Sequence, residues 1–200
     1  FFIFQIIKHI YIMFIMPPLK TPICDFGTNA KDFQLNSTIN KFISLNDIRG
    51  KNGTLIMFIC NHCPYVKAVI KDVVEDCKNL EKFGINSTAI SSNNAVKYPE
   101  DSFENMIKFS KEHKFNFPYL FDKTQNVAKS YGAVCTPDFF GFNANLELQY
   151  RGRVRELKNL KPVKNGESDL FKAMKKISKT GIGPKEQLPS LGCSIKWLNS

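Results

Sequence analysis

The sequence predicts a single α/β domain with a central mixed β-sheet. The chain has 200 residues and 43% hydrophobic content, which is enough for one full core. Apolar runs of strand length alternate with amphipathic helical patterns along it. Their order is strand, helix, strand, helix, strand, short helix, hairpin and helix, which is typical of an α/β domain with a mixed sheet.

The first elements are a hairpin, a buried strand and a helix. Residues 31–51 contain two short alternating runs around a polar turn, which predict a β-hairpin and then a short turn of helix ended by Gly50. Residues 54–60 ("TLIMFIC") are an apolar run, typical of a strand covered on both faces. Apolar residues at helical spacing over 66–80 predict an amphipathic helix ended by Gly84.

The second half of the chain continues this alternation. Residues 85–91 ("INSTAIS") predict a strand, and "DSFE" at 101–104 resembles a capping box that opens a helix with Phe103, Met106 and Ile107 inside. A short strand, a short helix, a hairpin and a last helix are expected at residues 118–122, 124–132, 138–152 and 168–179. In such sheets the turns at the carboxyl ends of the strands form the functional site.

Charge and cysteine content narrow the function classes. The formal net charge is +10, but the lysines are spread along the whole chain, which argues against a nucleic-acid partner. The denser basic stretch at residues 151–164 is expected to be a solvated face. Six unevenly spaced cysteines are too few for a disulfide-stapled secreted scaffold.

The first fifteen residues form a separate apolar segment. It is interrupted by Lys8 and His9, is short for a bilayer span, and lacks both a leading Met and a small-residue cleavage signal. We interpret residues 1–15 as an upstream read-through, with a signal or membrane anchor as the alternative. The domain then covers residues 16–200 in the cytoplasm, or in an exported or membrane-anchored protein if the segment is translated.

The stretch "FICNHCPYVK" places two cysteines where the buried strand ends and a helix begins. We expect Cys60 at the end of the strand and Cys63 one turn into the helix. The positive end of the helix dipole stabilises a thiolate by up to about 2 kcal/mol, or about one pKa unit. His62 would add to this if it is protonated or donates a hydrogen bond.

This spacing favours redox chemistry. Thiolates attack disulfides and peroxides, and cysteines three residues apart can close a small disulfide ring. Pro64 is tolerated in the first helical turn. One alternative is half a zinc site, but the chain has no second C-x-x-C or H-x-H cluster. The other is a pair of inert structural thiols. No cofactor is expected.

The sequence resembles the thioredoxin-fold superfamily, and more closely its peroxiredoxin-like (AhpC/TSA, redoxin) family. The resemblance runs from Met16 onward through "FICNHCPYVKAVI", "YPEDSFENM", "FPYLFDKTQNVAKSYGAVCTPDFFGF", "YRGR" and "GCSIKW". It implies a thioredoxin fold with an N-terminal β-hairpin extension. It also implies a cis peptide bond between Thr136 and Pro137, facing the redox pair.

The same resemblance implies a redox enzyme, either a thiol-disulfide oxidoreductase or a peroxiredoxin-like antioxidant oxidoreductase. Peroxiredoxins carry a P-x-x-x-T-x-x-C pattern, in which Cys63 takes the place of the peroxidatic cysteine, Cys60 that of the Thr and Ile56 that of the Pro. Two supports of that pattern are absent, which shifts weight to disulfide exchange with Cys60 attacking and Cys63 resolving. A thiol peroxidase with Cys63 peroxidatic, and a metal-binding or redox-sensing module, are the alternatives.

Four further residues belong to this interpretation. Cys135 precedes the cis-proline candidate, Cys193 lies in the terminal "GCSIKW", and either is a third redox thiol or a packed residue. Asp138 is a candidate proton acceptor, and Cys77 is expected in the core of its helix. The expected partners are protein or small-molecule disulfides or hydroperoxides and an unidentified thiol electron donor, with a membrane only if residues 1–15 are an anchor.

Overall fold

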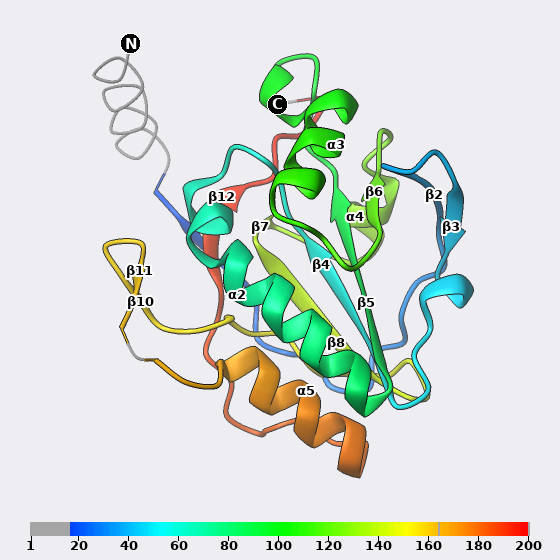
Figure 1. Cartoon of the computed structure of the whole chain (residues 1–200), viewed down its shortest axis with the longest axis vertical. Helices are drawn as coiled ribbons and strands as arrows, with labels where there is room; N and C mark the ends of the chain where they lie inside the picture. The colour runs from blue at the N-terminus through cyan, green and yellow to red at the C-terminus, as the bar shows by residue number, and fades with distance from the viewer. Residues whose placement is uncertain (1–16, 164, 200) are drawn as a thin grey trace.

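The computed structural model describes residues 17–163 and 165–199, and it has the expected α/β architecture around a mixed sheet (Figure 1). The interpretations of residues 1–15 lie outside the described residues and stay predictions. Within the described residues, no helix combines the length and apolar character that a membrane crossing needs.

The main sheet has seven strands in the order β3-β2-β6-β5-β4-β8-β9. They are β2 (Gln34–Ser37), β3 (Phe42–Ser44), β4 (Gly53–Phe58), β5 (Ile85–Ser91), β6 (Tyr119–Phe121), β8 (Asp138–Asn143) and β9 (Leu148–Tyr150). Strands β4, β5 and β6 run parallel, whereas β8 pairs antiparallel with β4, and β2 with β6. The mixed sheet and the N-terminal hairpin β2-β3 are therefore confirmed.

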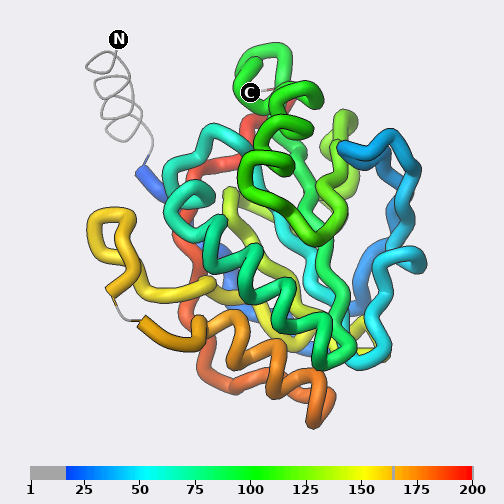
Figure 2. The backbone as a smooth tube through the Cα atoms, in the orientation of Figure 1, coloured from blue at the N-terminus to red at the C-terminus, as the bar shows by residue number. Residues whose placement is uncertain are grey.

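The helices are α2 (Pro64–Leu80), α3 (Phe103–Glu112), α4 (Asn126–Ser130) and α5 (Asp169–Thr180). Three 3₁₀ turns accompany them: η1 (Asn46–Ile48), η2 (Glu81–Phe83) and η3 (Pro99–Asp101). Helices α2 and α5 lie side by side across one face of the sheet, and α3 packs into the same core (Figures 1 and 2). Helix α4 and the residues before η1 cover the other face.

Strand β4 is central to both cores because every one of its residues is buried. Leu55 and Met57 pack with the helices α2 and α5, while Ile56 and Phe58 pack on the opposite face with Tyr131. Each such buried side chain contributes about 1.5–3 kcal/mol, so β4 is fixed from both sides. Its carboxyl end is a rigid support for the loop that follows.

Some predicted boundaries were wrong. The helical turn η1 ends before Arg49 rather than at Gly50, and Cys63 caps helix α2 instead of lying one turn inside it. Ser102, not Asp101, is the N-cap of α3, and its hydroxyl accepts from the Asn105 N–H. The capping motif therefore begins one residue later than predicted. The Asp101 side chain does not cap α3, and it makes other hydrogen bonds.

The basic stretch at 151–164 is not simply a solvated face. Arg151 is buried and paired with Asp138, Arg153 is paired with Asp169, and Arg155 with Asp72. These arginines tie the chain after β9 to neighbouring elements. Charge counted along the sequence could not show this, because each partner lies on another segment.

A second, three-stranded sheet has the order β1-β12-β7. It consists of β1 (Leu19–Lys20), β7 (Cys135–Thr136) and β12 (Leu191–Ser194), and a separate small hairpin pairs β10 (Leu157–Lys158) with β11 (Lys161–Pro162). Strand β12 runs antiparallel to β7, with Cys193 opposite Thr136. The C-terminal strand therefore lies beside the start of α2, as Figure 1 shows.

Candidate active site

The two cysteines of the C-x-x-C motif lie in the loop between β4 and α2. Cys60 follows the end of β4 by two residues, and Cys63 is the N-cap of α2 with Pro64 in the first helical position. Both cysteines have 0% of their surface exposed. The motif is thus held between a buried strand and a long helix, beneath other parts of the chain.

The Thr136–Pro137 peptide bond is cis, as the family resemblance implied. Thr136 contacts both sulfurs: its hydroxyl Oγ1 lies 3.2 Å from Cys60 Sγ, and its carbonyl oxygen accepts from the Cys63 thiol at 3.1 Å. The structure therefore brings Cys60, Cys63, Thr136 and Pro137 together, although they are distant in sequence.

The two thiols have opposite electrostatics. Burial raises the pKa of Cys60 well above its ordinary value, and the neighbouring Cys63 raises it further. Burial also opposes ionisation of Cys63, but hydrogen bonds from the side chains of Cys193 and Cys60 and from backbone N–H groups lower the pKa of Cys63 well below its ordinary value. Of these two residues, Cys63 is the favoured thiolate.

His62 is held by a carboxylate that is fully buried. Its Nδ1 lies 2.6 Å from Oδ2 of Asp101, whose side chain is 0% exposed. Burial opposes the charged imidazolium, yet the hydrogen bond and charge of Asp101, together with the charge of Cys63, raise the pKa of His62. Coupling of this kind is mutual, so a protonated His62 favours the Cys63 thiolate.

Asp101 organises the loop as well as the imidazole. Its oxygens accept from the backbone N–H of Asn61 at 2.8 Å and from the Asn93 side-chain amide at 2.7 Å. The hydroxyl of Tyr119 in turn donates to the Asn61 side chain at 3.0 Å. Four of these residues were not predicted from the sequence as site residues: Asp101, Asn61, Asn93 and Tyr119. The signal for Asp101 was an acidic residue just before α3, which had been assigned to helix capping.

The third thiol near the pair is Cys193. Its sulfur lies 3.2 Å from Cys63 Sγ, and unlike Cys60 and Cys63 this residue is only half-buried. Cys135 is buried next to them, but its thiol is directed at the Pro137 carbonyl oxygen, 3.8 Å away, and burial strongly raises its pKa. Cys77 lies in the core of α2, where burial raises its pKa to about 12.

Asp138 is an ion-pair partner and not a free proton acceptor. Its Oδ2 lies 2.8 Å from the Arg151 guanidinium, which also donates to the Gly132 carbonyl and stacks over the Phe140 ring. Burial raises the pKa of Asp138, and the charge of Arg151 opposes that rise. The pair anchors the start of β8 directly after Pro137.

Within residues 17–163 and 165–199, one cluster of candidate metal ligands is present, and its side chains already make hydrogen bonds. Cys60, His62 and Asp101 each offer one ligand atom, and these three atoms lie within 4.8 Å of one another. However, Asp101 already accepts the hydrogen bonds described above, and zinc usually needs four ligands. This donor set fits the positioning of His62 better than it fits a metal.

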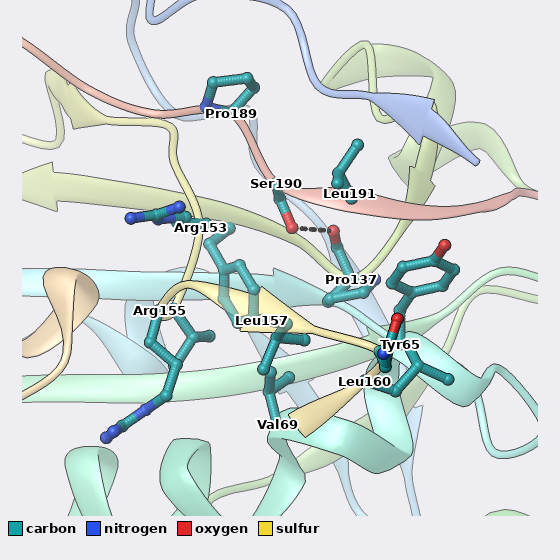
Figure 3. A pocket seen from close by; sticks show the side chains of 13 residues that line it. Tyr65, Val69, Pro137, Arg153, Arg155, Leu157, Leu160, Pro189, Ser190 and Leu191 are labelled. Atoms are coloured by element: carbon teal, nitrogen blue, oxygen red, sulfur yellow. Dashed lines mark hydrogen bonds between the residues drawn. The ribbon is translucent and has the colours of Figure 1, made fainter. Parts of the chain in front are cut away.

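A pocket of about 290 Å³ opens beside the cis-proline. Figure 3 shows Tyr65 and Val69 of α2 on one side of Pro137, with Ser190 and Leu191 of the C-terminal segment near it. The Ser190 hydroxyl donates to the Pro137 carbonyl at 2.9 Å, the dashed line in Figure 3. Arg153, Arg155 and Leu157 complete one wall, so the pocket is largely apolar with a basic margin.

The model of the AhpC/TSA family matches residues 26–156, which is more than half of the chain. The chain belongs to the AhpC/TSA family. No curated protein matches it significantly. AhpC/TSA proteins act on disulfides or peroxides with thiol donors, so the expected membership of a family of redox proteins is confirmed.

Solved structures extend the comparison. An uncharacterized conserved protein from Geobacillus kaustophilus shares 40% identity with this AhpC/TSA protein at a TM-score of 0.86, covering 92% of this chain and 98% of that one. A hypothetical protein from Sinorhizobium meliloti 1021 shares 32% identity at a TM-score of 0.82, covering 90% and 98%. The thioredoxin domain of a thiol-disulfide oxidoreductase from Bacteroides vulgatus matches with 18% identity and a TM-score of 0.55, covering 70% and 91%. The thioredoxin fold is therefore confirmed.

Proposed function

We propose that this protein is a thiol-disulfide oxidoreductase whose redox pair is Cys60 and Cys63. The observation that carries the proposal is the contact of Thr136, the residue before the cis-proline, with both sulfurs. Two thiols three residues apart at the start of a helix are suited to cycle between dithiol and disulfide. The substrates would be protein or small-molecule disulfides, with a thiol as the electron donor.

The electrostatics support a different order of attack from the one inferred from the sequence. From the sequence, Cys60 was expected to attack, but the lowered pKa of Cys63 supports Cys63 as the nucleophile. In this scheme the Cys63 thiolate attacks a substrate disulfide, forms a mixed disulfide and expels one substrate thiolate. Cys60 then loses its proton, attacks Cys63 Sγ, expels the second substrate thiolate and forms the Cys60–Cys63 disulfide.

Two serine variants test the function and the roles together. Glutathione disulfide is added to Cys60→Ser and to Cys63→Ser, and adducts are mapped by mass spectrometry. In Cys60→Ser we expect Cys63 to react, ending either as a mixed disulfide with glutathione or as a disulfide with another cysteine of the chain. In Cys63→Ser we expect slow or no reaction of Cys60. Rapid trapping on Cys60 would restore the original roles, whereas no reaction above that of free cysteine in either variant would reject the function.

A thiol peroxidase is the second candidate, and the lowered pKa of Cys63 favours it as well. Cys63 would attack a hydroperoxide, becoming a sulfenic acid and releasing an alcohol or water, and Cys60, Cys135 or Cys193 would condense with it to a disulfide and water. The reduced protein is mixed with one equivalent of hydrogen peroxide. Oxidation at Cys63 much faster than that of free cysteine supports this candidate, and oxidation no faster rejects it.

The site gives no reason to expect a nucleic-acid partner, since the arginines of the basic stretch near it are ion-paired with this chain's own carboxylates.

We also propose that the protein lies in the cytoplasm, because a dithiol with a free third thiol suits reducing surroundings. Localisation of a tagged full-length chain by microscopy and fractionation tests this, and recovery in a membrane or secreted fraction would contradict it.

A further inference from the structure

The redox pair is closed off from solvent, and this raises the question of how electrons reach it. Cys60 and Cys63 both have 0% of their surface exposed. A thiol or disulfide outside the protein has to touch the sulfur that it attacks, because exchange proceeds through a mixed disulfide. The reaction described above therefore needs a route from the surface to the pair.

Strand β12 places a third sulfur on such a route. Cys193 Sγ lies 3.2 Å from Cys63 Sγ, and Cys193 is half-buried where the other two are fully buried. A disulfide between the two needs a separation of about 2.05 Å, so a shift of roughly 1 Å would join them. Cys193 is thus both within reach of the pair and closer to solvent.

The backbone is adapted to this approach. Cys193 pairs with Thr136 across β12 and β7, and Gly192 precedes it. A Cβ atom on Gly192 would lie only 2.1 Å from the Thr136 carbonyl oxygen. Only glycine at this position lets β12 lie so close to the cis-proline segment, and that closeness holds Cys193 against Cys63.

From this geometry we propose that Cys193 is a relay thiol, which carries electrons between an external thiol donor and the buried Cys60–Cys63 pair. The inference rests on the proposed function and specifies how its disulfide is reduced. In the first step the Cys193 thiolate attacks Cys63 Sγ. The Cys60–Cys63 bond breaks, a Cys63–Cys193 bond forms, and Cys60 leaves as a thiolate that takes up a proton.

An external thiolate completes the cycle in two further steps. It attacks Cys193 Sγ, so that Cys63 leaves as a thiolate and the donor is joined to Cys193. A second donor thiolate attacks that mixed disulfide, which releases the donor disulfide and leaves Cys193 reduced. Two donor thiols are oxidised for each Cys60–Cys63 disulfide reduced, and the relay step itself moves no net electrons.

The surroundings of Cys193 favour its attack when Cys60 and Cys63 are joined in a disulfide, and not when they are reduced. In the reduced protein, its hydrogen bond to Cys63, its burial and the Cys63 charge raise the pKa of Cys193, so it is a poor nucleophile. When Cys63 is bonded to Cys60, the hydrogen-bonded thiolate and its charge are gone. Lys196, whose charge lowers the pKa of Cys193, then acts with less opposition.

The test compares Cys193→Ser with Cys24→Ser, a matched control in which another half-buried cysteine is replaced. Each full-length protein is oxidised to the Cys60–Cys63 disulfide and reduced with glutathione, and free thiols are counted over time by alkylation and mass spectrometry. We expect Cys193→Ser to be reduced about tenfold more slowly or worse, because the buried pair is then attacked directly, and Cys24→Ser to match the wild type.

Two further variants protect the test against a folding artefact. Cys60→Ser treated with glutathione disulfide should form a Cys63–Cys193 disulfide, releasing two equivalents of glutathione. Gly192→Ala keeps every cysteine but should push β12 away, and it should also slow reduction. Circular dichroism checks each fold.

The outcomes separate the two proposals. If the Cys60–Cys63 disulfide forms but Cys193→Ser is reduced as fast as the wild type, or if Cys60→Ser gives no Cys63–Cys193 bond, the relay is overturned and the proposed function stands. If no Cys60–Cys63 disulfide forms in any variant, the proposed function fails and the relay fails with it.

Discussion

Nδ1 of His62 lies 2.6 Å from a carboxylate oxygen of Asp101, and this contact connects the turn η3 with the loop that carries Cys60 and Cys63. The carboxylate is fully buried and the imidazole is partly exposed. A negatively charged acceptor that water does not reach strongly favours the protonated form of the imidazole beside it. Asp101 therefore acts on the cysteines through His62, as a positioning residue.

Replacing Asp101 by Asn should lower the pKa of His62. The isosteric amide keeps one acceptor but removes the negative charge that, with its hydrogen bond, outweighs the burial of the imidazole. We expect this fall to be visible in an NMR titration of the imidazole protons. Because the two groups are coupled, the pKa of Cys63 should rise, seen as an alkylation rate whose pH midpoint moves upward.

Asp25→Asn is the control for this measurement. Asp25 is exposed, and its side chain accepts a hydrogen bond from the nearby Thr28 hydroxyl, so both titrations should match the wild type. An Asp101→Asn protein that folds normally but keeps the wild-type midpoint for Cys63 would show that His62 does not tune this thiol.

Thr136→Val should hinder Cys60. Valine keeps the β-branched shape but removes the hydroxyl, whose hydrogen bond lowers the otherwise raised pKa of Cys60. A hydrogen bond of this kind is worth about 0.5–1.5 kcal/mol, so release of the mixed disulfide by Cys60 should slow roughly two- to tenfold. Stopped-flow measurement of the release step checks this, and Thr136→Ser, which restores the hydroxyl, should recover most of the rate.

Asp76 makes stability depend on pH. It lies on α2, accepts from Ser168 at the start of α5, and burial raises its pKa to about 6 from 3.8. The folded protein therefore holds this proton more tightly than the unfolded chain. The resulting stability is fully present below pH 3.8 and is lost as the pH rises through about 6. The shift corresponds to an upper limit of roughly 3 kcal/mol.

Asp76→Asn isolates that contribution, because the amide is neutral at every pH and can still accept from Ser168. We expect the substitution to cost more free energy of unfolding at pH 4 than at pH 7, measured by urea denaturation. Asp25→Asn, on an exposed carboxylate, serves as the control. Equal costs of Asp76→Asn at the two pH values would contradict a raised pKa.

Most of the fold could be predicted because its elements have strong local patterns. The apolar run of β4 and the helical spacing over α2 correspond to a strand and a helix within a few residues of the expected bounds. The cis bond before Pro137 was reached through the family resemblance. These features are visible locally or in recognisable blocks of sequence.

The parts that were missed depend on distant pairing. Strand β12 has only four residues, "LGCS", with no periodicity, and its position is set by hydrogen bonds to β7 and β1. The reach of Cys193 to Cys63 therefore could not be read from the sequence. Asp101 was misassigned for a related reason: a local capping motif offered a sufficient role, and its partners His62 and Asn93 lie on other loops.

The buried pair of Asp138 and Arg151 should be essential to the segment that carries the cis-proline. Removing one charge leaves the other buried without a partner, which typically costs 3–5 kcal/mol, whereas replacing both is far less costly. We expect Arg151→Leu to lower the free energy of unfolding by about that amount, and Arg151→Leu with Asp138→Asn to recover much of it.

Because Asp138 follows Pro137 directly, Arg151→Leu should also loosen the contacts of Thr136 with Cys60 and Cys63 and slow disulfide exchange. Urea denaturation and the exchange assay on the same three proteins decide this, since a double variant no more stable than Arg151→Leu alone would show that the arginine acts mainly through its contacts with Phe140 and Gly132.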